Sequence, residues 1–368
     1  MVTPCYYPVK GGTETVVRNL SIALNKIGTH TDVMTFNMDR KWNPKWKGKT
    51  EKIDGITVFK IPALNWLPIE HSPRVTSGIN LIPGRFTHLL KSYDIIHFHE
   101  DLSFPLFSIL VKKPKLFHIH GGITWEIKRS HLSKAILNHI ADFYISISRK
   151  MEKDLLEQGI AKHKITYLPN GVNTKLFSPI RKKENNLLLF VGRITLGKGL
   201  HILLDSLHHL KEPVHLVIIG PADWSHKYYQ DMLKLMEMEN RKGRHQITYL
   251  GALDQTDVVK WYQKASIFIL PSFGEGFPVV TLEALSCETP VIATPVGGIP
   301  ELVRNHENGI LVPPNESINL AKAIQFLLEN KEIRTRFGRE GRKRVVKNYS
   351  LEAVVKKLRR IYEQLINS

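Results

Sequence analysis

Cysteine is nearly absent from this chain of 368 residues, which has only Cys5 and Cys287. Two cysteines so far apart in the sequence supply neither a disulfide framework nor a cysteine-based metal site. Long apolar runs are missing as well. No stretch approaches the ~18 consecutive apolar residues of a membrane-spanning helix, and residues 1–4 do not begin a signal peptide. These absences argue against a disulfide-rich secreted protein and an integral membrane protein, and we expect a cytoplasmic one.

Acidic residues are also scarce beside basic ones, since 34 aspartates and glutamates stand against 52 lysines and arginines. The resulting formal net charge of +18 at pH 7 lies mostly in the first half of the chain. Such an excess favours acidic partners, whether phosphates, anionic lipid or nucleic acid. The charge alone does not choose among them.

Short apolar blocks are abundant, and in the second half they alternate with helical patterns. The expected strands span residues 187–191, 214–219, 247–250, 267–270, 291–293 and 310–312. The expected helices span residues 200–210, 228–240, 254–264, 279–286 and 318–329. Continuous apolar strands joined by helical crossovers indicate a parallel sheet covered on both faces.

The first half follows the same plan less regularly. Its expected strands span residues 2–3, 32–36, 56–61, 95–98, 116–119, 143–147 and 165–168, with a helix at 13–27. A chain of this length is expected to form two domains of ~150–200 residues. The sequence therefore predicts an α/β protein of two doubly wound, Rossmann-like domains, residues 1–180 and 181–350, facing a central ligand cleft. Further helices are expected at 331–348 and 351–366.

Two glutamates, Glu275 and Glu283, bracket the turn Gly276-Phe277-Pro278, which opens an apolar helix. Pro278 suits the first helical position, and the free N–H groups there can seat an anion. Ionised carboxylates accept hydrogen bonds from the vicinal hydroxyls of sugars. The helical rise places the two carboxylates ~10 Å apart, about the span from ribose to hexose in a sugar nucleotide. Each glutamate also has a simpler explanation: one favours the helix dipole, and the other reaches solvent.

Two cations precede this segment. Arg193 follows an expected strand and Lys198 opens the next helix. A cation at each place can neutralise a diphosphate, which the glutamates alone would repel. Without the downstream glutamates, the pair would be read as a solvated turn.

The glutamate segment and the G-R-x-x-x-x-K-G spacing at 192–199 resemble the motifs of retaining, nucleotide-sugar-dependent family-4 glycosyltransferases, which have the GT-B fold. The resemblance extends over nearly the full chain. It implies that Glu275 holds hexose hydroxyls, that Glu283 holds the ribose diol, and that Arg193 and Lys198 stabilise the departing nucleoside diphosphate. It also implies that the last helix, about 351–368, returns to the N-terminal domain.

Two features of the first half resemble the same family. Gly11 and Gly12 correspond to its glycine loop, where backbone approaches the phosphate or the hexose because no Cβ intervenes. His120 occupies the place of its strand-end histidine, which contacts the donor sugar near the reacting carbon. Family members usually carry several more residues before the position of Val2, which leaves open whether Met1 is the true start.

Histidines also raise the alternative of a metal centre, because His97 and His99, like His118 and His120, form H-x-H pairs. No matching acidic ligands follow later strands, and there is no D-x-D motif. We therefore expect metal-independent catalysis, with no metal site and no cofactor besides the nucleoside-diphosphate sugar used as donor substrate. His97 and His118 are expected to be core histidines bonded to backbone.

A basic segment, residues 40–49, contains five cations, Trp42 and Trp46, and residues 64–68 add Trp66. This composition suits an anionic membrane surface, although single-stranded nucleic acid or a solvated loop would also explain it. The membrane is the preferred functional hypothesis, with a lipid or a lipid-linked glycan as acceptor.

The sequence thus predicts a retaining hexosyltransferase acting on a hydroxyl acceptor, a glycan or lipid-linked glycan, at the inner face of a membrane, with no nucleic-acid partner. The alternatives are a basic membrane- or nucleic-acid-binding protein on a non-catalytic GT-B scaffold, a metallohydrolase, and a nucleotide-sugar epimerase of the same fold. The donor base is expected near residues 249–251.

Overall fold

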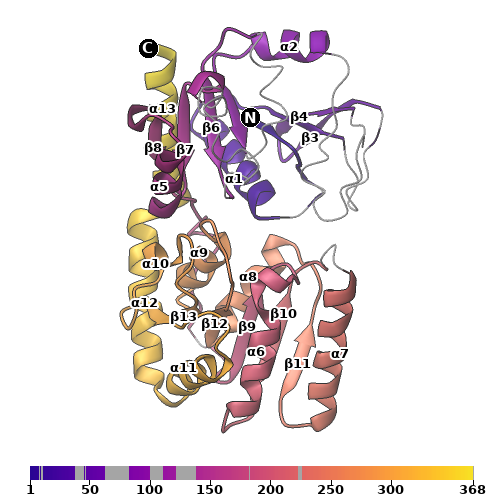
Figure 1. The fold of residues 1–368 in the computed structure, drawn as a ribbon, viewed down its shortest axis with the longest axis vertical. Coiled ribbons are helices and arrows are strands. Elements are labelled where there is room, and N and C mark those ends of the chain that lie inside the picture. The colour runs from indigo at the N-terminus through magenta and orange to yellow at the C-terminus, as the bar shows by residue number, and fades with distance from the viewer. Residues whose placement is uncertain are drawn as a thin grey trace. The chain divides into compact units, whose positions relative to one another are not determined.

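The computed structural model describes residues 1–7, 9, 11–37, 45, 47–62, 83–99, 111–121, 138–181, 183–222 and 226–367. The chain divides into two compact units (Figure 1). The first unit consists of Met1–Asn170 and Leu351–Ser368, and the second consists of Gly171–Ser350. The second unit therefore begins ahead of the boundary at residue 180 that the sequence led us to expect.

The first unit contains a sheet of eight strands in the order β3-β4-β2-β1-β5-β6-β7-β8. The strands are β1 (Val2–Thr3), β2 (Val33–Phe36), β3 (Lys49–Ile53), β4 (Ile56–Ile61), β5 (Ile96–His99), β6 (Lys115–Ile119), β7 (Phe143–Ser146) and β8 (Ile165–Tyr167). All neighbours pair in parallel except β3 and β4, which form an antiparallel hairpin at the edge. Asp54 and Gly55 supply the two positive φ angles, 52° and 80°, that a tight hairpin turn requires.

The helices of the first unit come from both ends of the chain (Figure 1). They are α1 (Gly12–Lys26), α2 (Pro83–Lys91), α5 (Arg149–Glu157) and α13 (Leu351–Asn367). The apolar face of α13 is buried, α13 packs on α1, and the Tyr362 hydroxyl is hydrogen-bonded to Nδ1 of His97 at 2.6 Å. The last helix is therefore part of the sheet domain that opens the chain.

The second unit contains a parallel sheet of six strands in the order β11-β10-β9-β12-β13-β14. The strands are β9 (Leu187–Val191), β10 (His215–Ile219), β11 (Gln246–Tyr249), β12 (Ile267–Leu270), β13 (Val291–Ala293) and β14 (Gly309–Leu311). Numbered in chain order the strands lie as 3-2-1-4-5-6, which is the Rossmann arrangement. Strands are added to one side of β9 first and then to the other, so the switch point lies between β9 and β12. Ligands of such sheets bind outside the carboxyl ends of the strands at that switch point.

Helices cover this sheet around a buried apolar core. They are α6 (Leu200–Ser206), α7 (His226–Lys242), α8 (Gln255–Lys264), α9 (Val279–Ser286), α10 (Ile299–Leu302), α11 (Ser317–Glu329) and α12 (Lys331–Asn348). The expected helix at 200–210 is in fact α6 followed by the 3₁₀-helix η4 (Leu207–His209). Within the described residues, no helix is both long and apolar enough to cross a membrane.

The segments expected to bind a membrane lie largely outside the described residues. Residues 64–68 are not described, and residues 40–49 are described only at Lys45 and 47–49. Lys49 begins the edge strand β3 and forms an ion pair with Glu51, its Nζ lying 2.5 Å from Oε2. The membrane interpretation therefore stays a prediction.

Candidate active site

The turn after β9 carries both predicted cations and lies against the end of β12. Gly192 and Arg193 leave the strand, and Lys198 ends the 3₁₀-helix η3 (Leu196–Lys198). The next residue, Gly199, has a φ of 68°, and a Cβ there would lie 2.1 Å from the carbonyl oxygen of Pro271. Only glycine allows this approach, so the turn is held on the loop that follows β12.

That loop brings Glu275 to Lys198. The Nζ of Lys198 lies 2.5 Å from Oε1 of Glu275, and the hydroxyl of Ser272 donates to the same oxygen at 2.7 Å. The Glu275 side chain is 7% exposed and that of Lys198 is 27% exposed. A carboxylate so buried is held by its ion pair and hydrogen bond. The cation remains open to solvent on one side.

A third loop, after β13, packs closely on the backbone of Glu275. Gly297 has a φ of 56°, and a Cβ there would lie 1.7 Å from the Glu275 carbonyl oxygen. The N–H of Gly298 donates to the carbonyl of Gly276 at 2.8 Å, and the Thr294 hydroxyl donates to the carbonyl of Ser272. The loops after β9, β12 and β13 therefore form one rigid set at the carboxyl ends of the central strands.

Pro278 lies one residue outside the first helical position that it was expected to hold. Pro278 is the N-cap, not the first helical residue, because its ψ of 116° is extended; α9 begins at Val279. Pro278 has no side-chain hydrogen bond to offer at this end. Its carbonyl accepts from the Thr281 N–H at 3.2 Å, so the N–H groups of Val279 and Val280 keep their capacity to bind an anion. Phe277 anchors the turn: it is 3% exposed and packs on Tyr349 with ring centroids 5.6 Å apart.

Glu283 lies on α9 and is 6% exposed, so the idea that it reaches solvent is wrong. Gln255 of α8 donates to its Oε1 at 3.4 Å. Burial raises the pKa of Glu283 to about 7, and the hydroxyl of Tyr262 and the amide of Gln255 lower it by less. Glu283 therefore changes charge near neutral pH.

In the first unit, Gly11 is the N-cap of α1, with an extended φ of −163° that any residue can adopt. Gly12 starts the helix, and a Cβ there would meet no atom within 4 Å. Among the described residues, nothing therefore crowds the position of a side chain at Gly12. The close backbone approach that the family resemblance implies stays a prediction about a ligand.

Four histidines gather at the ends of β5 and β6. The parallel register pairs His99 with His118, and the rings of His118 and His120 have centroids 4.2 Å apart, which confirms that these two share a face. Nδ1 of His99 is hydrogen-bonded to Nε2 of His120 at 2.8 Å. Burial lowers the pKa of His97, His99 and His118 well below the usual value, so these rings are neutral.

Two expectations about this cluster were wrong. His97 is bonded to the Tyr362 hydroxyl and not to backbone, and among the described residues neither ring nitrogen of His118 has a hydrogen-bond partner. Sequence reasoning also overlooked His99 as the partner of His120. The signal was present, because His99 ends a strand two residues after His97 and adjacent parallel strands end side by side.

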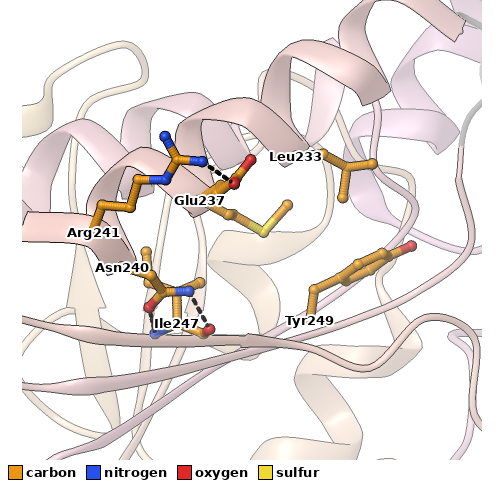
Figure 2. Close-up of a pocket in the computed structure, with 7 residues that line it drawn as sticks. Leu233, Glu237, Asn240, Arg241, Ile247 and Tyr249 are labelled. Atoms are coloured by element: carbon orange, nitrogen blue, oxygen red, sulfur yellow. Dashed lines mark hydrogen bonds and ion pairs between the residues drawn. The ribbon is translucent and has the colours of Figure 1, made fainter. Parts of the chain in front are cut away.

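The described part of the second unit also has a pocket of about 440 Å³ between α7 and β11 (Figure 2). It is lined by Leu233, Met236, Glu237, Asn240, Arg241, Ile247 and Tyr249. The side-chain amide of Asn240 exchanges two hydrogen bonds with the backbone of Ile247, at 2.8 and 2.9 Å. This amide covers part of the open edge of the sheet. The pocket contains none of the predicted catalytic residues and touches the expected base region only at Tyr249.

The predicted site residues thus fall into one set per unit. The second unit brings Lys198 and Glu275 into contact, with Arg193 on the same turn as Lys198 and Glu283 on the helix that follows Glu275. The first unit holds Gly11, Gly12 and His120 after the carboxyl ends of β1 and β6.

Comparison with known proteins gives two matching family models. The model described as Glycosyltransferase Family 4 matches residues 10–176, and that described as Glycosyl transferases group 1 matches residues 172–344. An uncharacterized glycosyltransferase of Methanocaldococcus jannaschii is 26% identical over 375 residues, covering 98% of this chain and 96% of the relative. The O-antigen chain mannosyltransferase C of Escherichia coli is 23% identical over 391 residues, covering 99% and 97%.

Solved structures show the same architecture. Sucrose-phosphate synthase from Thermosynechococcus elongatus superposes with a TM-score of 0.81 at 25% identity, covering 100% of this chain and 98% of the synthase. Anabaena HepE in complex with UDP-glucose superposes with a TM-score of 0.77 at 17% identity, covering 99% of each chain.

Proposed function

Because the chain belongs to the group 1 glycosyltransferases of family 4 and has the GT-B fold, we propose that it transfers a hexose from a nucleoside-diphosphate sugar to a hydroxyl acceptor with retention of configuration. The observation that carries this proposal is the contact of Lys198 with Glu275 at the switch point of the second unit's sheet. That pair offers a cation for a phosphate and a carboxylate for sugar hydroxyls in one rigid place.

On binding of the donor, Lys198 and Glu275 would separate, Lys198 to contact the diphosphate and Glu275 to contact the hexose. The diphosphate would take Lys198, Arg193 and the N-terminus of α9, whose uncapped N–H groups favour an anion. Glu275 would then accept hydrogen bonds from the hexose hydroxyls, and Glu283 from the ribose diol. The close contacts of Gly199 with Pro271 and of Gly297 with Glu275 hold these loops rigidly. Catalysis that depends on the position of the donor needs this rigidity.

The transfer itself needs no protein nucleophile. The bond between the anomeric carbon and the leaving phosphate oxygen breaks, and the acceptor oxygen bonds to the same face of that carbon. The acceptor's proton passes to the leaving phosphate oxygen. Lys198 and Arg193 stabilise the negative charge that grows on the diphosphate. His120, held by His99, would donate a hydrogen bond beside the reacting carbon.

The acceptor is proposed to be a cell-envelope glycan, including a lipid-linked one presented at an anionic membrane surface. This rests on the O-antigen chain mannosyltransferase among the relatives and on the formal net charge of +18. The donor class is supported by the binding of UDP-glucose in HepE.

The test is a thermal-shift panel of UDP-, GDP- and ADP-sugars on the full chain, with and without EDTA. One base should raise the melting temperature, equally well in EDTA. Turnover of that donor with glycan acceptors, followed by release of nucleoside diphosphate and by the anomeric configuration of the product, then tests transfer and retention. Absence of any shift, or an inverted product, would contradict the proposal. Conversion of donor without acceptor would indicate an epimerase instead.

A further inference from the structure

Three histidines of the first unit are not used in the proposed transfer. His97, His99 and His118 are at most 2% exposed. One ring nitrogen from each lies within 4.8 Å of the corresponding nitrogens of the other two. Within the part of the chain that the structure describes, this is the one group of three His, Cys, Asp or Glu side chains whose ligand atoms lie so close together.

Four ring nitrogens of this group lack hydrogen bonds to the described residues. Among the described residues, Nε2 of His97, Nε2 of His99 and both ring nitrogens of His118 are buried without a partner. Buried polar atoms in native proteins are nearly always satisfied, and each exception asks for an explanation, including an ion that binds there. An arrangement kept only for packing would be served better by apolar side chains.

The outer nitrogens, by contrast, are engaged. Nδ1 of His97 is hydrogen-bonded to the Tyr362 hydroxyl at 2.6 Å, and Nδ1 of His99 to Nε2 of His120 at 2.8 Å. Metal-ligating histidines characteristically use one nitrogen for an outer hydrogen bond, which orients the ring, and present the other to the ion. His97 and His99 both show this division, with Nε2 left to bind.

We propose that His97, His99 and His118 form a binding site for a divalent transition-metal ion of the class that prefers imidazole ligands, such as zinc. Ligand nitrogens around a tetrahedral zinc ion lie ~3.4 Å apart. The nitrogens already lie within 4.8 Å of one another, and the rings, whose planes are 1° to 31° apart, would tilt against each other to close on the ion. A water molecule would take the fourth position. Among the described residues the cluster offers only imidazole nitrogens, which disfavours calcium and magnesium because those ions take oxygen ligands.

Because its three ligands are buried, we assign the ion a role in holding the fold and none in binding a substrate. It would join β5 to β6 and, through Tyr362, to α13, the helix contributed by the end of the chain. A metal on Nε2 of His99 would also fix the proton of that ring on Nδ1, so that His99 donates to His120. This inference stands independently of the proposed glycosyl transfer.

The experiment measures zinc binding by the full chain after dialysis against a chelator. Stoichiometry is determined by elemental analysis, and affinity by competition with a chromogenic zinc chelator. We expect one tightly bound zinc per chain and a zinc-dependent rise in melting temperature. Cobalt substituted for zinc should give the visible absorption of a tetrahedral site.

His118→Leu should weaken binding at least ~100-fold and abolish the zinc-dependent thermal shift. In chelator its melting temperature should equal or exceed that of the wild type, because the change removes two unpartnered buried nitrogens. Tyr362→Phe, which removes the outer bond of His97, should weaken binding ~10–100-fold. His163→Leu, on an exposed histidine, is the control and should bind as the wild type does.

Binding of less than about one zinc per ten chains would overturn the proposal. So would a His118→Leu chain that binds zinc within about threefold of the wild type, because the metal would then be held elsewhere. If His118→Leu does not fold, Tyr362→Phe decides: an unchanged zinc affinity in that variant overturns the site.

Discussion

The two units place different chemistry near the switch points of their sheets. In the first unit, imidazoles follow β5, which borders the switch point, and its neighbour β6, with His99 and His120 in contact. In the second, the two strands that border the switch point, β9 and β12, are followed by an ion pair, Lys198 with Glu275. The sheet topology determines where a site forms, and the residues that follow each strand determine what the site can bind.

The difference has a physical consequence for binding. A half-exposed cation beside a buried carboxylate can exchange part of its ion pair for an anionic ligand, and the carboxylate then becomes available to hydroxyl groups. Neutral imidazoles offer lone pairs and N–H groups but no net charge. Four variants test the difference between the two units, and they follow from the largest expected change in activity or stability to the smallest.

Removing the carboxylate should produce the largest effect. Glu275→Ala should reduce transfer by about 10³-fold or more, or ~4 kcal/mol of transition-state stabilisation, because the hexose hydroxyls lose their acceptor. The chain should remain folded, since Lys198 can reach solvent. Turnover is measured by release of nucleoside diphosphate.

The matched control is another glutamate in an ion pair of similar length. Glu237 contacts Arg241 at 2.6 Å, but both side chains are largely exposed. Glu237→Ala should leave turnover unchanged, since exposed pairs contribute little. Full activity in Glu275→Ala would remove the basis for the assignment.

The second-largest effect is expected when the close packing of Gly297 on the Glu275 backbone is disturbed. In Gly297→Ala the new Cβ would collide with the Glu275 carbonyl at a φ of 56°, and the strain should destabilise the second unit by about 3 kcal/mol or more. Gly274→Ala is the control, because a Cβ there meets no atom within 4 Å. Urea unfolding of both variants gives the comparison. Equal stability would mean that the three loops are not rigidly joined.

The third effect is a dependence of folding stability on pH, which Glu283 introduces. Its pKa is raised from 4.5 to about 7 in the folded chain, so the folded state retains the proton that the unfolded state loses. The stability of the wild type should therefore fall, relative to Glu283→Gln, as the pH rises from about 4.5 through about 7, by on the order of 3 kcal/mol. Urea unfolding at several pH values measures it. A pH-independent difference would contradict the raised pKa.

The same titration should appear in donor binding. The ionised carboxylate offers both oxygens as acceptors to the ribose diol, whereas protonation turns one of them into a donor, so donor affinity should rise as the pH increases through about 7. Glu283→Gln should bind donor weakly and without this rise. Binding calorimetry across that pH range tests the slope.

The smallest effect on folding is expected in the glycine loop of the first unit. Gly12→Ala should change stability by less than about 0.5 kcal/mol, because the Cβ meets no atom within 4 Å. Transfer should nevertheless fall, because a ligand that approaches this backbone would meet the new methyl group. Unchanged transfer would mean that no substrate lies against Gly12.

Much of the second unit was predictable from the pattern of residues. The strands β9, β12 and β13 and the helix α9 match the expected bounds to the residue, because fully buried parallel strands form uninterrupted apolar blocks between turns. The edge strand β3 was missed because its residues are polar and largely exposed. The short helix α10 was missed because four residues show no helical period.

The site was predictable residue by residue but not as a set of contacts. Lys198 and Glu275 could each be read from local motifs, yet their contact spans 77 positions and depends on β9 and β12 being neighbours in the sheet. The partnership of His99 with His120 likewise depends on strand register, which no local pattern specifies. The one-residue shift at Pro278 reflects its backbone ψ, which sequence does not reveal.

The position of α13 has a consequence for how the protein is made. A ribosome releases residues 1–170 before the second unit, but Tyr362, which binds His97, is synthesised after it. The first unit therefore lacks the helix that packs on α1 until the whole of the second unit has been synthesised. The half of the protein that is translated first cannot bury the surface beneath α13 until that helix leaves the ribosome.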